Sequence, residues 1–257
     1  MEDIFVKHHG SNVETDWKRV NLFSAIVEQL DDVRTARPRW MDTSKGTIGY
    51  ERIEGLRPAL ARPINQLPIV MARIGKALAH LHAVREMDAS PLSGVRAEDK
   101  EGAATIAEHS DVESGFFWGD CWHGNIFTDT YDRLVFIDPL PNRWLFPNQT
   151  YRASVLIDLA MLHMSIYFCH PLIRLLRLDH RRYRMAGEKL LESYEEAAKT
   201  PLTRSCALRS SREMALRYID TYRARLPPPL AELKRRVSCR LVSRLDAASC
   251  WSNEHVL

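Results

Sequence analysis

The stretch that decides the fold is Phe116–Leu140, which reads FFWGDCWHGNIFTDTYDRLVFIDPL. An apolar run turns sharply into Asp120, and Asn125 follows five residues later. A polar turn then leads into a second apolar run, Leu134–Ile137, which ends at Asp138. Two carboxylates and an amide at the ends of short apolar strands suit the binding of a hydroxyl group, a divalent cation and a phosphate. The pattern therefore favours a site for phosphoryl transfer.

The composition is that of an ordinary globular protein. The 257 residues are 45% hydrophobic and 27% charged, which allows one large domain or two lobes. The net charge of +3 is too small to argue for a nucleic-acid partner. Five scattered cysteines without CxxC spacing indicate a reducing compartment and no zinc site. Because we see neither a signal segment nor a long apolar run, we expect a cytoplasmic protein without a membrane partner.

Hydrophobic periodicity in the first part of the chain predicts a small unit of strands and one helix. We expect a strand over Asp3–His8, a helix over Asp16–Leu30 and a strand pair formed by Arg39–Asp42 and Thr47–Glu51. The intervening stretch, Asp31–Pro38, is expected to be a polar loop.

The rest of the chain is expected to be mainly helical. Leu67–Arg85 predicts a helix with an apolar stripe of Ile69, Ile74, Leu78 and Leu81, and Asp88–Glu113 predicts a surface loop. Further helices are expected over four stretches: Tyr151–Tyr167, Arg182–Lys199, Pro201–Leu226 and Pro229–Ala248. Because strands and helices are segregated rather than alternating, the fold class is α+β. We divide the chain near Gly55, into a small lobe over 1–55 and a helical lobe over 56–257.

Two motifs carry a resemblance to a known family. WGDCWHGNIF at 118–127, followed by LVFIDPLP at 134–141, resembles the aminoglycoside phosphotransferase/choline kinase family. The family motif runs His-Gly-Asp-x-x-x-x-Asn and then Ile-Asp, and Trp118 stands here in place of its His. The resemblance implies a two-lobed protein-kinase-like fold and transfer of the ATP γ-phosphate to a small-molecule hydroxyl. It implies Asp120 as catalytic base, with Asn125 and Asp138 as Mg²⁺ ligands.

Three further residues match positions that support the catalytic loop in the family. His123 precedes Asn125 as it often does there, and His82 ends ALAHLH, which is similar to the family's Leu-His helix. Asp158, in IDLA, matches the Asp-Leu-Ala that follows the metal-binding strand. We expect all three to be structural, with Asp158 forming a buried hydrogen bond that braces the loop.

The nucleotide side of the site is indicated by two short segments. GYERIEG at 49–55 resembles the segment that links the lobes and meets adenine, which implies Tyr50, Glu51 and Ile53 as nucleotide contacts. Lys7, in IFVK, matches the strand lysine that contacts the ATP phosphates. An exposed lysine on an edge strand explains those four residues equally well.

The chain differs from the family ahead of Lys7, where only six residues precede it. A lobe of this type places two strands and a phosphate-covering glycine-rich loop there. We therefore expect either a truncated or degenerate member, or a true start that lies upstream of the given sequence. The open sheet edge would then be a route to self-association. No glutamate of the following helix is well placed to pair with Lys7, and Glu14 is the candidate that we retain.

Two functions stay open on these grounds. The first is an ATP- and Mg²⁺-dependent phosphotransferase whose acceptor is a small hydroxyl compound such as an aminoglycoside, choline or a sugar. The alternative is a catalytically impaired kinase-like remnant that binds a nucleotide or a protein. The basic stretches Arg174–Arg184 and Lys234–Arg244 are interpreted as solvated helix faces, so no nucleic acid is expected. A nucleic-acid binder would instead show a steep salt dependence.

Overall fold

The computed structural model describes residues 3–63, 65–84, 116, 118–140, 156–168, 180–199, 227–229, 232 and 236. The expected loop Asp88–Glu113 and the expected helix Pro201–Leu226 lie outside these residues. Of the expected helix Pro229–Ala248, residues 229, 232 and 236 are described, and all three are helical.

The N-terminal strands form a three-stranded antiparallel sheet in the order β1 (Ile4–His8), β4 (Thr47–Glu51), β3 (Pro38–Asp42). The register places Phe5 opposite Tyr50. Side chains two residues apart on a strand lie on the same face, so residues 5 and 7 of β1 share the face of Tyr50. The three strands expected from the sequence are confirmed, and β1 and β3 are the outer strands of this sheet as the structure describes it.

Helix α1 (Val13–Val27) follows a single 3-10 turn, η1 (Gly10–Asn12), and packs against the small sheet. Val20 of the helix shares a small apolar cluster with Ile48 and Tyr50 of β4. The helix expected from the apolar period is thereby confirmed, and it forms one wall of the small lobe.

The second sheet has four strands, in the order β2 (Val33–Thr35), β7 (Leu134–Phe136), β6 (Ile126–Thr128), β5 (Arg57–Pro58). Strands β6 and β7 form the expected hairpin, and β2 runs parallel to β7. The interpretation of Asp31–Pro38 as a loop was therefore wrong. A three-residue strand is too short to show a period, and its partner lies far along the chain, so no local signal revealed it.

Three long helices cover this sheet and its loops. They are α2 (Leu67–Ala83), α4 (Leu156–Phe168) and α6 (His180–Ala198). Two short 3-10 turns, η2 (Ala59–Ala61) and η5 (His123–Asn125), precede α2 and β6.

Helices α2 and α6 pack closely at a glycine. A Cβ atom at Gly75 would lie 2.5 Å from the backbone oxygen of Leu190, so a larger side chain would push the helices apart. The expected apolar stripe of α2 is confirmed except at Ile69, which is 65% exposed. Ile69 is five residues from Ile74, which is about 140° away around a helix and therefore off the buried face.

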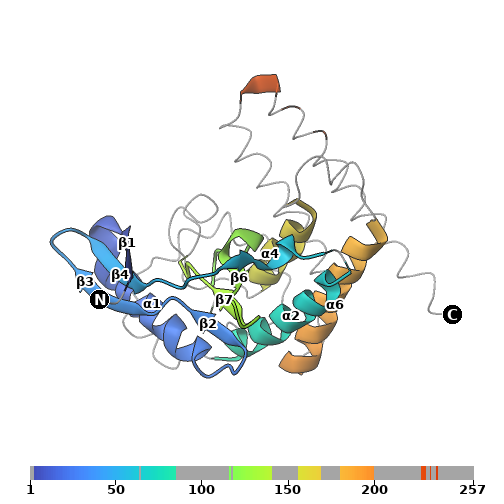
Figure 1. The fold of residues 1–257 in the computed structure, drawn as a ribbon, viewed down its shortest axis with the longest axis horizontal. Helices are drawn as coiled ribbons and strands as arrows, with labels where there is room; N and C mark the ends of the chain where they lie inside the picture. Colours follow the sequence, from blue (N-terminus) through green and yellow to red (C-terminus); the bar gives the residue numbers. More distant parts are fainter. Residues whose placement is uncertain are drawn as a thin grey trace, which may run out of the picture.

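Figure 1 shows how these units are arranged. The small sheet and α1 lie at one end, α2 and α6 lie at the other, and the strands of the second sheet lie between them. Strand β2 belongs to residues 1–55 but pairs with β7, which belongs to 56–257. The division of the chain at residue 55 stays a prediction.

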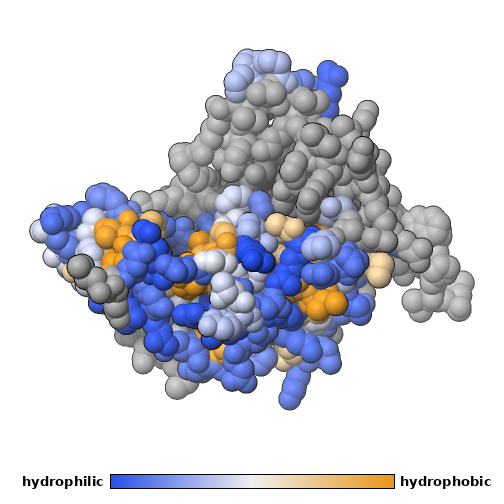
Figure 2. Space-filling model, in the orientation of Figure 1, coloured by the Kyte–Doolittle hydropathy of each residue, from blue (hydrophilic) through white to orange (hydrophobic). Residues whose placement is uncertain are grey.

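The main core joins the second sheet to the helices. Trp118 and Phe136 stack at a centroid distance of 4.8 Å, and Phe23 of α1 packs on Trp118 at 5.4 Å. None of the described helices is long and apolar enough to cross a membrane. On the face seen in Figure 2 the described surface is largely hydrophilic, with a few separate hydrophobic patches.

The buried histidine of α4 leads to a prediction about pH. His163 is 3% exposed, and burial lowers its pKa from 6.5 to about 4. Between these two values the unfolded chain binds a proton at His163 that the folded chain does not. This contribution to stability is therefore full above pH 6.5 and is lost as the pH falls towards 4, to the extent of about 3 kcal/mol.

Denaturant unfolding at pH 7 and pH 4.5 measures this loss. His163→Leu should remove a corresponding part of the difference between the two pH values, whereas His80→Gln, at an exposed position of α2, should not. Equal pH dependence in the wild type and in His163→Leu would contradict the prediction.

Candidate functional site

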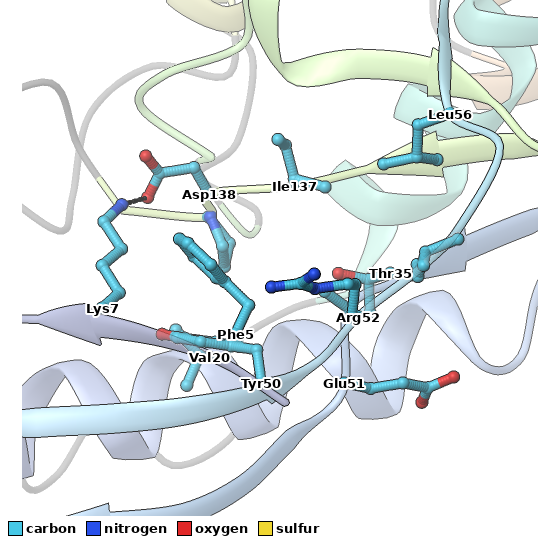
Figure 3. A pocket seen from close by; sticks show the side chains of 13 residues that line it. Phe5, Lys7, Val20, Thr35, Tyr50, Glu51, Arg52, Leu56, Ile137 and Asp138 are labelled. Atoms are coloured by element: carbon cyan, nitrogen blue, oxygen red, sulfur yellow. Dashed lines mark hydrogen bonds and ion pairs between the residues drawn. The ribbon is translucent and has the colours of Figure 1, made fainter. Parts of the chain in front are cut away.

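A cavity of about 450 Å³ lies between the small sheet and the end of β7 (Figure 3). That volume is within the range of small-molecule sites. Its apolar walls come from both lobes and consist of Phe5, Val20, Ala36, Ile53, Leu56, Ile137 and Pro139. Its polar groups are Lys7, Thr35, Glu51, Arg52 and Asp138, together with the largely buried ring of Tyr50.

The cavity brings together several residues that the sequence placed far apart. Lys7, Tyr50, Glu51, Ile53 and Asp138 all line it, although Lys7 and Asp138 are 131 positions apart. The two carboxylates that the sequence assigns to one site, Asp120 and Asp138, therefore do not both line this cavity. Asp138 faces the cavity, whereas Asp120 is not among its lining residues.

Lys7 and Asp138 form an ion pair in this cavity. The Nζ atom of Lys7 lies 2.5 Å from Oδ1 of Asp138, and the two side chains are 36% and 33% exposed. Figure 3 shows this contact at one side of the cavity. Glu14 is exposed at the start of α1, and within the described contacts Lys7 pairs with Asp138 and not with Glu14.

The backbone around Asp138 is held in an unusual conformation. Asp138 has φ 55°, in the left-handed region that costs a non-glycine residue about 1–2 kcal/mol. Its carbonyl oxygen accepts a hydrogen bond of 2.9 Å from Nε1 of Trp118, and the carbonyl of Pro139 accepts one of 3.0 Å from Nε of Arg19. These two buried donors hold the turn that directs the carboxylate of Asp138 into the cavity.

The stretch around Asp120 forms a tight turn closed by Asn125. The Nδ2 of Asn125 donates to the carbonyl oxygen of Asp120 at 2.9 Å and to its Oδ2 at 2.7 Å. The carbonyl of Asn125 accepts a hydrogen bond of 3.1 Å from the backbone N–H of Ile137. The structure therefore brings Asp120 and Asn125 into direct contact, and it places them beside the strand end that carries Asp138.

Asp158 connects this loop to the helices. Its Oδ2 accepts a hydrogen bond of 2.6 Å from the backbone N–H of Trp118, and its Oδ1 accepts one of 2.8 Å from Gly119. His82 lies between Asp158, at 3.3 Å from Nε2, and the hydroxyl of Tyr194, at 3.0 Å from Nδ1. Asp158 is fully buried, so these contacts are what compensate its charge.

Two aromatic groups around the loop have defined partners. Burial, and secondarily the charge of Asp158, raises the pKa of Tyr194, which keeps its hydroxyl protonated. The backbone N–H of His123 donates to Oγ of Ser165 in α4 at 3.1 Å, and the rings of His123 and Trp122 meet edge to face at 4.6 Å.

Several groups of the site were not singled out from the sequence. Phe5 could have been found, because it lies two residues before Lys7 and must share its face of β1. Thr35 could not have been found in this way, because its three-residue strand shows no local sequence pattern. The hydrogen bonds of Trp118 and Arg19 to backbone carbonyls leave no sequence signal, since any residue supplies the acceptor.

The next feature of the site is its set of oxygen atoms that could bind a divalent cation. Within the described ranges there is no cluster of three or more His, Cys, Asp or Glu side chains able to hold a metal. Magnesium in phosphotransferase sites takes only one or two protein carboxylates and adds phosphate oxygens. The amide nitrogen of Asn125 donates to Asp120, so its amide oxygen is the atom that could bind a cation, and Asp138 presents a carboxylate. These donors fit such an ion.

Comparison with known proteins was informative at the level of structure. No protein-family model and no curated protein sequence matches the chain. It is similar to choline kinase LicA from Streptococcus pneumoniae, with TM-score 0.56, 13% identity and coverage of 95% of this chain and 86% of that one. For a glucosamine kinase the TM-score is 0.61 at 14% identity, with 96% and 76% covered.

A third similar structure is the aminoglycoside phosphotransferase APH(3'')-Id from Streptomyces rimosus, in complex with ADP and streptomycin. Its TM-score is 0.51 at 17% identity, with 82% of this chain and 85% of that chain covered. At such identities the likeness establishes the fold alone. The chain has the protein-kinase-like α+β fold of these small-molecule kinases, and the fold class expected from the sequence is confirmed.

Proposed function

We propose that this protein is an ATP- and Mg²⁺-dependent phosphotransferase that moves the γ-phosphate to a hydroxyl group of a small molecule. The observation that carries the proposal is the cavity in which Lys7 and Asp138 meet, directly beside the turn of Asp120 and Asn125. The structurally similar proteins are kinases of choline, aminoglycosides and glucosamine, which supports a small-molecule acceptor of this kind. A cytoplasmic location, where ATP is available, fits the same proposal.

The nucleotide would lie in the cavity with its base between the apolar walls. Phe5 from the small sheet and Ile137 from the end of β7 both line the cavity, and Figure 3 labels both side chains. The backbone of the segment containing Glu51 and Ile53 would meet the base, and the ammonium group of Lys7 would contact the phosphates. An ADP complex and an AMP complex among the similar structures support the proposal that this protein binds a nucleotide.

Asp120 would act as the catalytic base. Its carboxylate orients the acceptor hydroxyl and takes its proton as the oxygen forms a bond to the γ-phosphorus and the bond to ADP breaks. Asn125 and Asp138 would hold magnesium, which when bound supplies charge neutralisation at the transferred phosphate. The hydrogen bond from Asn125 to Oδ2 of Asp120 fixes the direction of the base relative to these ligands.

One observation favours the alternative of a catalytically impaired, nucleotide-binding remnant. Lys7 is paired with the carboxylate of Asp138 itself, and not with a glutamate of α1. A lysine in that position competes with a cation for the same oxygen. Such a protein would bind a nucleotide and fail to turn it over.

Transfer assays decide between the two. Purified protein is incubated with MgATP and separate acceptors, including amino sugars, choline, neutral sugars and aminoglycosides, and phosphorylated product is detected by mass spectrometry. We expect product with at least one acceptor. Binding of MgATP without phosphate transfer or hydrolysis across the panel would favour the remnant, and absence of both binding and transfer would contradict the proposal.

A further inference from the structure

Helix α1 is joined to the wall of the cavity by a chain of three largely buried polar side chains. Nδ1 of His9 lies 2.9 Å from Oδ2 of Asp16, and Nε2 of His9 lies 3.1 Å from the hydroxyl of Tyr50. The side chains of His9 and Asp16 are 1% and 2% exposed. Because a buried carboxylate is costly without partners, Asp16 is tied to the position of the His9 ring.

His9 is itself fixed by the backbone of the β3–β4 turn. Its backbone N–H donates to the carbonyl oxygen of Gly46 at 2.7 Å, and the N–H of Gly10 donates to the same oxygen at 3.1 Å. With a proton on Nδ1, His9 donates to Asp16 and accepts from Tyr50, and a doubly protonated ring donates to both. The chain is therefore continuous in either state.

Tyr50 brings this chain to the place where the phosphates are proposed to bind. Phe5 and Lys7 lie on one face of β1, Tyr50 pairs with Phe5, and both Lys7 and Tyr50 line the cavity. The hydroxyl of Tyr50 reaches His9, which directly follows the strand that carries Lys7. Burial first, and then the carboxylates of Asp138 and Asp16, raise the pKa of its hydroxyl, which stays protonated and available to hydrogen bond.

The same helix makes a second buried link to the other side of the cavity. Arg19 donates from Nε to the carbonyl oxygen of Pro139 at 3.0 Å, and its guanidinium lies over the ring of Phe116 at 4.7 Å. Asp138 immediately precedes the proline. Helix α1 thus contacts both sides of the Lys7–Asp138 pair through polar groups, although within the described contacts it provides no carboxylate to Lys7.

We infer that Asp16 and His9 are positioning residues of the nucleotide site, acting through Tyr50 to hold the strand that carries Lys7. In this arrangement a chain of hydrogen bonds from Asp16 through His9 and Tyr50 would hold Lys7 in position. In protein kinases a helix glutamate does this by pairing with the lysine directly. This inference rests on the proposed function, because it assigns these residues to the binding of MgATP.

A double-mutant cycle on MgATP affinity tests the inference. Asp16→Asn removes the charge with little change of shape, and Tyr50→Phe removes only the hydroxyl at the other end of the chain. We expect each single substitution to raise the Kd for MgATP by about 2- to 10-fold, and the double variant to be no weaker than the worse single variant. Isothermal titration calorimetry on the whole chain gives the Kd values, and His9→Gln replaces Asp16→Asn if that variant does not fold.

The controls separate positioning from stability. Denaturant unfolding of each variant reports stability, and Asp31→Asn and Tyr131→Phe, both at exposed positions, should leave the Kd unchanged. If the two changes in Kd simply multiply in the double variant, or if Tyr50→Phe binds MgATP like the wild type, the hydrogen-bond chain does not position Lys7. The inference is then wrong, while the proposed function stands. If the wild type binds no MgATP, the proposed function fails with it.

Discussion

Asp120→Asn should reduce phosphoryl transfer by about 10²–10⁴-fold while MgATP binding changes little, because an amide cannot accept the proton of the acceptor hydroxyl. The substitution is nearly isosteric, and the hydrogen bond from Nδ2 of Asn125 to the Asp120 backbone carbonyl does not depend on the side chain. The turn should therefore survive the change. The loss should fall on kcat, since the group acts on the proton in the transition state and contributes little to nucleotide affinity.

The measurement is turnover of MgATP with whichever acceptor the wild type phosphorylates, together with a binding isotherm for MgATP. Asp31→Asn, which changes an exposed carboxylate outside the site, is the matched control and should keep full turnover. A fall of less than about threefold in Asp120→Asn would contradict the role of this residue as the base.

Asp158→Ala is expected to have the largest effect on stability, a loss of about 3–5 kcal/mol in the free energy of unfolding. The substitution removes the acceptor for two backbone N–H groups, those of Trp118 and Gly119, and leaves His82 without its charged partner. All of these groups are buried, so water cannot replace the lost hydrogen bonds without opening the core.

Urea unfolding measures the stability of Asp158→Ala, and hydrogen exchange locates the damage. Exchange should accelerate first at the amides of Trp118 and Gly119, because these lose their acceptor directly. Asp158→Asn keeps one acceptor oxygen and should lie between the wild type and the alanine variant. A loss below about 1 kcal/mol for Asp158→Ala would mean that the loop is held by other contacts.

The fold could be predicted from the sequence where the local hydrophobic pattern agrees with which residues are buried in the structure. Helices α1 and α2 each show an apolar period and bury the face that it indicates, with Ile69 as an exception. The strands of the small sheet were predicted in place, although Phe5 and Val6 of β1 stay about half exposed. Strand β2 could not be predicted, because its three residues form a strand only through pairing with β7. Because β2 was not predicted, Thr35 could not be assigned to the cavity from the sequence.

The candidate site divides in a similar way. Asp120, Asn125 and Asp138 were predicted from their order and spacing, and the structure brings Asn125 into contact with Asp120. The pairing of Lys7 with Asp138 was not, since it depends on how the small sheet lies over the end of β7. The indole hydrogen bond of Trp118 shows the same limit. Trp118 stands where the resembled motif has His, and its Nε1–H donates to the backbone carbonyl oxygen of Asp138, a contact that the motif does not predict.

Lys7 and Asp138 are proposed to form a site for a nucleotide phosphate and its cation. A thermal-shift titration with ATP, in the presence and absence of magnesium, tests it most directly in the wild type, Asp138→Ala and the exposed control Asp31→Ala. We expect the Tm of the wild type and of the control to rise by roughly 5 °C at saturating MgATP, and this rise to require magnesium. In Asp138→Ala the Tm should hardly change on addition of MgATP. An equal rise in Asp138→Ala, or no rise in the wild type, would contradict the account.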